Sequence, residues 1–104
     1  METLNAKNIA QSIGSGIVII DFFAPWCRPC IAFAPVFEKF ANEFSSKAKF
    51  FKVDIDEAPT IAADYDILSI PTILVFREGV EVERKFGAMG EIDFRIWING
   101  ILNK

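Results

Sequence analysis

The stretch IVIIDFFAPWCRPC, residues 17–30, joins a buried strand to a helix. Its first seven residues are apolar except for Asp21 and rich in β-branched side chains, which is typical of a strand buried on both faces. From Cys30 to Phe44 apolar residues recur at helical spacing, and Pro35 within this run predicts a kink. The chain's only two cysteines therefore lie where the strand ends and the helix begins.

The rest of the sequence predicts strands that alternate with helices and end in a hairpin. Glu78-Gly79 separates two strand-like runs and predicts an antiparallel turn. The expected elements are strands over 49–55, 72–76 and 80–86, helices from Pro59 to about Tyr65 and from Glu91 to Leu102, a short strand near Thr3-Leu4 and a helix over Ala6 to Ile13. This order indicates an α/β domain with a mixed sheet.

Length and composition indicate one globular domain over residues 1–104, since 52% of the residues are apolar. A formal charge of −3 argues against nucleic acid or an anionic membrane as a partner. The chain has no run of 18 apolar residues that could span a membrane. Its start, METLNAKN, lacks the features of a signal peptide, which favours a cytoplasmic location, although a processed exported chain would look the same.

The two cysteines could be part of a metal site, a structural disulfide or a redox pair. A closed zinc site needs four ligands, and the chain has no histidine and no third cysteine. Such a site would require ligands shared between two chains, or carboxylates, so we expect no metal. A structural disulfide across so short a loop would restrict the unfolded chain little.

The place of Cys27 and Cys30 favours redox catalysis. Unpaired backbone N–H groups and the helix dipole at the start of a helix stabilise a thiolate, which is the attacking species in thiol–disulfide exchange. Cys27 lies at the edge and is expected to be exposed and nucleophilic. Cys30, one turn inward, could attack the resulting mixed disulfide.

Asp21 is unusual because it lies within an apolar strand, where an unpaired carboxylate is costly. Burial would raise its pKa and suit it to exchange protons near neutrality. The alternative is an aspartate at the end of the strand that turns toward solvent.

The segments IIDFFAPWCRPC, VDID, IPT and FGA, in this order and at these separations, closely resemble the thioredoxin family. The resemblance runs from about Asn5 to the C-terminus. It implies the thioredoxin fold, a central mixed sheet with helices on both faces. It also implies a monomeric protein-disulfide reductase without a bound cofactor, which acts on client proteins with disulfides. Thioredoxin reductase, a flavoprotein that uses NADPH, would re-reduce it.

The resemblance also implies roles for individual residues. Cys27 matches the attacking cysteine and Cys30 the resolving one. Asp21 matches a buried acid/base that helps to deprotonate the resolving cysteine through water. Lys52 matches a lysine beside that aspartate, although alone it would be interpreted as an ordinary strand lysine.

Ile70-Pro71-Thr72 matches a family segment with a cis-proline beside the dithiol, where backbone is presented to an extended substrate. Without the resemblance, a trans bond would be expected here, because only about 5–6% of such bonds are cis. Trp26 could likewise be a core residue and Gly87 a turn glycine. The predicted substrate-binding residues are Trp26, Arg28, Pro29, Ile70, Pro71, Gly87 and Ala88.

Two positions depart from the family pattern. Arg28 replaces the commonest residue, glycine, and Ile31 replaces a frequent lysine. Arg28 could favour the Cys27 thiolate by charge attraction, point into solvent, or select acidic clients. The departures leave open a more oxidising or client-specialised oxidoreductase. A non-catalytic binding module is the alternative from a different class, but such a module needs neither the cysteine pair nor Asp21.

Overall fold

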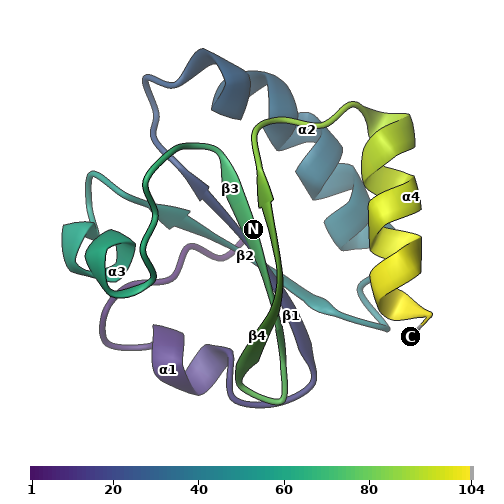
Figure 1. Cartoon of the computed structure of the whole chain (residues 1–104), viewed down its shortest axis with the longest axis horizontal. Helices are drawn as coiled ribbons and strands as arrows, with labels where there is room; N and C mark the ends of the chain where they lie inside the picture. The colour runs from purple at the N-terminus through teal and green to yellow at the C-terminus, as the bar shows by residue number, and fades with distance from the viewer. Residues whose placement is uncertain (104) are drawn as a thin grey trace.

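A computed structural model describes residues 1–103 of the chain. The elements in chain order are α1 (Ile9–Ser12), β1 (Ile17–Phe23), α2 (Arg28–Glu43), β2 (Lys49–Asp54), α3 (Pro59–Asp64), β3 (Thr72–Arg77), β4 (Val80–Phe86) and α4 (Glu91–Leu102). Figure 1 shows α1 and α3 on one side of the sheet and α2 and α4 on the other. The expected sheet with helices on both faces is confirmed.

The sheet is mixed, and its strand order is β2-β1-β3-β4. β1 runs parallel to β2 and antiparallel to β3, and β3 pairs with β4 as a hairpin. β1 therefore has a strand on each side and a helical layer over each face. This explains its nearly continuous apolar sequence, because a strand covered on both faces has no solvent side.

Two apolar cores lie on opposite faces of the sheet. Ile20 and Phe22 of β1 contribute to the core under α1 and α3, whereas Ile19 contributes to the core under α2 and α4. The second core is built around aromatic rings. Phe94 of α4 packs edge-on against Phe33 and Phe40 of α2, with ring centroids 5.1 and 5.2 Å apart.

The predicted helices and the four longer strands are all present, but two helices begin elsewhere. α2 begins at Arg28, two residues earlier than predicted, because Cys27 acts as its N-cap and its Sγ accepts a hydrogen bond from Cys30 N. The first helix covers only Ile9–Ser12, because the Asn5 side chain accepts hydrogen bonds from the next backbone N–H groups and holds residues 6–8 in a turn. The expected strand near Thr3 is a single bridge to Lys52. α2 continues through Pro35, and the kink there stays a prediction.

We expect Phe94→Ala to lower the free energy of unfolding by about 3–5 kcal/mol, because it leaves a cavity among three packed rings. Ile96→Ala is the matched control, since this residue lies on the same helix but is exposed, and its effect should stay within about 0.5 kcal/mol. Urea denaturation of both variants measures the difference. Equal losses would contradict the described packing of α4.

Candidate active site

Cys27 and Cys30 form a disulfide between the end of β1 and the first turn of α2, with Cα atoms 5.2 Å apart. The backbone N–H of Cys30 donates a hydrogen bond to Cys27 Sγ over 3.2 Å. In the reduced protein this N–H group and the N-terminal end of the helix dipole would favour negative charge on the same sulfur. The site is thus arranged to stabilise a thiolate at Cys27.

The expected exposure of Cys27 is wrong for the disulfide form. Cys27 is only 5% exposed and Cys30 only 2%. Both pack in a small apolar cluster with Ala24, against which Phe23, Ile55 and Ile70 pack. Cys27 Sγ lies 3.9 Å from the carbonyl oxygen of Ile70. The loop before β3 therefore covers much of the sulfur, an effect that the local sequence around Cys27 does not reveal.

The Ile70–Pro71 peptide bond is cis, as the resemblance implies and contrary to the expectation from proline statistics alone. The carbonyl oxygen of Pro71 accepts a hydrogen bond of 2.9 Å from the backbone N–H of Gly87. Gly87 adopts φ of +85°, a conformation that favours glycine. Its interpretation as a turn glycine is therefore also consistent with the structure. The structure thus brings Ile70 beside the disulfide. Pro71 follows it in the chain and is bonded to Gly87, and Ala88 lies at the surface.

Trp26 is 67% exposed, so its interpretation as a core residue is wrong. Its indole Nε1 donates a hydrogen bond of 2.8 Å to Asp56 Oδ2. Arg28 and Pro29 are also exposed, in the first turn of α2. The predicted surface residues of the Cys27 loop are therefore available to a partner.

Asp21 is completely buried, so the alternative of a solvent-facing aspartate is wrong. Alternation along β1 places its side chain with Ile19, on the face that α2 covers. Neither carboxylate oxygen has a hydrogen-bond partner among the described residues. Burial raises the pKa of Asp21 to about 7, and the positive charge of Lys52 opposes this rise.

Lys52 lies beside Asp21 in the sheet, because the two residues are paired in the register of β1 and β2. Its Nζ lies 4.4 Å from the centroid of the Phe23 ring, within cation–π range. The ammonium group is thereby held near the carboxylate without a direct ion pair. The predicted proximity of the two groups is confirmed, and their roles are taken up below.

Sequence reasoning missed two features of this region. Asp56 belongs to the VDID segment, but nothing in the pattern indicated that it accepts a hydrogen bond from Trp26. Ile31 and Ala32 line a hollow together with Trp26 and Arg28. The sequence signal for this hollow is the apolar residue at position 31, one of the two departures from the family pattern.

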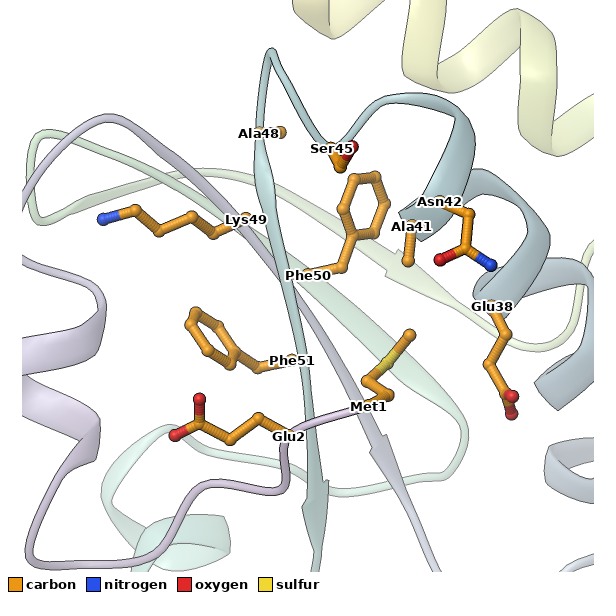
Figure 2. A pocket seen from close by; sticks show the side chains of 10 residues that line it. All are labelled: Met1, Glu2, Glu38, Ala41, Asn42, Ser45, Ala48, Lys49, Phe50 and Phe51. Atoms are coloured by element: carbon orange, nitrogen blue, oxygen red, sulfur yellow. The ribbon is translucent and has the colours of Figure 1, made fainter.

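Residues 1–103 contain neither of two other kinds of site, a metal site or a membrane span. Among residues 1–103, no group of three or more histidine, cysteine or acidic residues could hold a metal ion. Within the same residues, no helix is long and apolar enough to cross a membrane. A separate hollow of about 410 Å³ lies between the N-terminal residues, β2 and α2. Among its lining residues, Phe50 points toward α2 and Lys49 points away from it (Figure 2). No predicted site residue lines it.

The model of the family described as Thioredoxin matches residues 1–99. The chain belongs to the thioredoxin family. It is 42% identical over 81 residues to the thioredoxin of Staphylococcus haemolyticus, covering 78% of each chain. It is 46% identical over 87 residues to the thioredoxin of Chlamydia trachomatis, covering 84% of each. As in a thioredoxin-family thiol–disulfide oxidoreductase, Cys27 and Cys30 form the redox-active pair.

We expect Asp21→Asn to stabilise the protein by about 1–4 kcal/mol at pH 8, because it removes a buried carboxylate. Between about pH 4 and pH 7 the unfolded chain releases the Asp21 proton while the folded chain keeps it, so ionisation destabilises the fold progressively as pH rises. The advantage of the asparagine variant should therefore grow across this range and vanish near pH 4.

Urea denaturation of both proteins from pH 4 to pH 8, in the disulfide form, measures this difference. Asp64→Asn is the control, since Asp64 is exposed at the end of α3. An Asp21→Asn variant whose stability tracks the parent protein at every pH would show that Asp21 is not a buried acid.

Proposed function

We propose that this chain is a general protein-disulfide reductase in which Cys27 attacks the client and Cys30 resolves the intermediate. The observation that carries the proposal is the position of Cys27 Sγ. It accepts the hydrogen bond from Cys30 N at the start of α2 and lies beside the carbonyl oxygen of Ile70. An extended client that paired with backbone at Ile70-Pro71 would bring its own disulfide to this sulfur.

The reaction transfers two electrons from the reduced dithiol to the client. The Cys27 thiolate attacks one client sulfur, forms a mixed disulfide and releases the other client sulfur as a thiolate, which takes up a proton. The Cys30 thiolate then attacks Cys27 Sγ and restores the Cys27–Cys30 disulfide. The client sulfur that was bonded to Cys27 leaves as a thiolate. Because the two cysteines are already close enough to be bonded, the second step needs no large movement of α2.

Asp21 would accept the proton from the Cys30 thiol, through water, before the resolving step. A carboxylate with a pKa of about 7 can both take up and release a proton near neutral pH. Lys52, its neighbour in the sheet, would limit the cost of the buried negative charge when Asp21 ionises. In this proposal Asp21 and Lys52 act on Cys30, whereas the start of α2 acts on Cys27.

The docking surface around the Cys27 sulfur would consist of exposed and loop residues, with Arg28 at its edge. These residues are Trp26, Pro29, Ile70, Pro71, Gly87 and Ala88. The family resemblance supports thioredoxin reductase as the partner that restores the dithiol with electrons from NADPH. It supports equally a monomeric single-domain protein that acts in cytoplasmic electron transport and redox homeostasis. An assay with NADPH, a bacterial thioredoxin reductase and insulin disulfides tests the reductase function directly.

Arg28 and Ile31 favour a second candidate, an oxidoreductase that is more oxidising or specialised for certain clients. Both positions border the attacking cysteine and depart from the family pattern. The more oxidising form of this candidate would be rejected by two results together. The protein would reduce insulin, and its dithiol would have a reduction potential as negative as that of other thioredoxins. Redox equilibration of the dithiol against glutathione measures that property.

We expect Cys30→Ser to accumulate mixed disulfides with client proteins, because Cys27 can attack but nothing can resolve the intermediate. Cys27→Ser is the matched control and should trap none, because the N-cap position and the backbone N–H group that favour a thiolate act on Cys27 and not on Cys30. Non-reducing electrophoresis after incubation with a disulfide-containing client, with and without dithiothreitol, measures the trapped species. Equal trapping by both variants, or normal turnover by Cys30→Ser, would reverse or remove the assigned roles.

A further inference from the structure

Arg28 is the only one of the chain's four arginines whose guanidinium group has no partner among residues 1–103. Arg77 donates to the Ile101 carbonyl oxygen, Arg84 pairs with Glu81, and Arg95 pairs with Glu43. Arg28 forms no side-chain hydrogen bond or ion pair with the described residues and is exposed in the first turn of α2. A guanidinium group presents a planar set of donors that suits a carboxylate, so an unpaired one beside a reactive site is available to a ligand.

The same turn carries an apolar surface that the core does not explain. Ile31 is 58% exposed, although a β-branched residue has no advantage at an exposed helical position. It follows Arg28 by three residues, so the two side chains are neighbours on the surface of α2. Together with Trp26 and Ala32 they line a hollow of about 430 Å³. Apolar walls and a free guanidinium group are thus found in one hollow next to Cys27.

The two edges of the hollow carry opposite charges. The indole Nε1 is bonded to the carboxylate of Asp56, so an acidic ligand would be repelled at that edge of the ring and attracted at Arg28. The whole chain carries a net charge of −3, which gives acidic clients no long-range attraction. A preference for them must therefore come from local pairing with Arg28.

We propose that this hollow selects client segments in which an apolar residue and an acidic residue lie beside the attacked cysteine. The apolar side chain packs against Trp26 and Ile31, and the carboxylate pairs with Arg28. The inference rests on the proposed reductase function and names the clients that the same site prefers. Arg28 acts here as a specificity-determining residue.

Three synthetic peptides test the proposal. Each contains one intramolecular disulfide and a leucine near the attacked cysteine, and they differ only in one neighbouring residue, which is Glu, Gln or Lys. The reduced protein is mixed with each peptide, and acid-quenched samples are resolved by chromatography to give second-order rate constants. We expect the Glu peptide to react about two- to fivefold faster than the Lys peptide at low salt, as one exposed ion pair allows, and the ratio to approach one at high salt.

Arg28→Gln should bring the ratio of the Glu and Lys rate constants close to one. Lys47→Gln is the charge-matched control, because Lys47 is exposed in the loop before β2, away from the end of β1 that carries Cys27, and it should keep the ratio. A fourth peptide carries serine in place of the leucine of the Glu peptide. Ile31→Ser should lower the ratio of the rate constants of the leucine and serine peptides by about two- to fivefold, because it removes part of the apolar wall.

The ratio separates client selection from an effect on the thiol. An Arg28→Gln variant that slows all three peptides by one common factor would overturn the proposal, because Arg28 would then act on Cys27 itself. Equal rates for the Glu and Lys peptides with the parent protein would also overturn it, as would a Lys47→Gln variant that loses the ratio. If the parent protein reduces none of the peptides and no insulin, the reductase function fails and the proposal fails with it.

Discussion

β1 is covered on both faces, and this burial fixes the positions of the groups in the site. The strand lies between β2 and β3 and under helices on each side, so neither its register nor its direction can change without exposing apolar side chains. Because the C-terminal end of β1 is fixed, Cys27 has a fixed position at the start of α2. The same burial surrounds Asp21 with apolar neighbours and raises its pKa to about 7.

The burial of Asp21 connects stability to chemistry. A carboxylate in this position works against folding whenever it is ionised, and an apolar residue would fit the strand better. A group that holds a proton near neutrality could exchange it with the Cys30 thiol through water, as proposed above. The lysine beside it moderates the cost but does not remove it, since its charge lowers the pKa less than burial raises it. The proposed function in proton transfer would account for a residue that the fold alone would disfavour.

Much of the fold could be predicted because its signals are local. The apolar run of β1, the helical spacing in α2 and the Glu78-Gly79 turn each lie within a single element. The sequence predicts the start of α2 two residues late, because the cap of this helix is a sulfur atom and cysteine is not among the usual capping residues. The predicted exposure of Cys27 is wrong because two distant segments meet, and Ile70, 43 residues later, covers the sulfur. The hydrogen bond from Trp26 to Asp56, 30 residues later, is likewise not visible in any local pattern.

The residues proposed for the reaction are buried, whereas those proposed for client selection are exposed. Substitutions in the two groups therefore have different effects on stability. Cys30 and Asp21 lie inside the core, so replacing either alters packing or buried charge together with the reaction. Arg28, Ile31 and Trp26 are exposed, and replacing an exposed residue changes the stability of most proteins by less than about 0.5 kcal/mol. One scaffold can therefore keep a constant reaction while the exposed turn beside it varies. The two departures from the family pattern in this chain both fall on that turn, where they can alter the choice of client without cost to the fold.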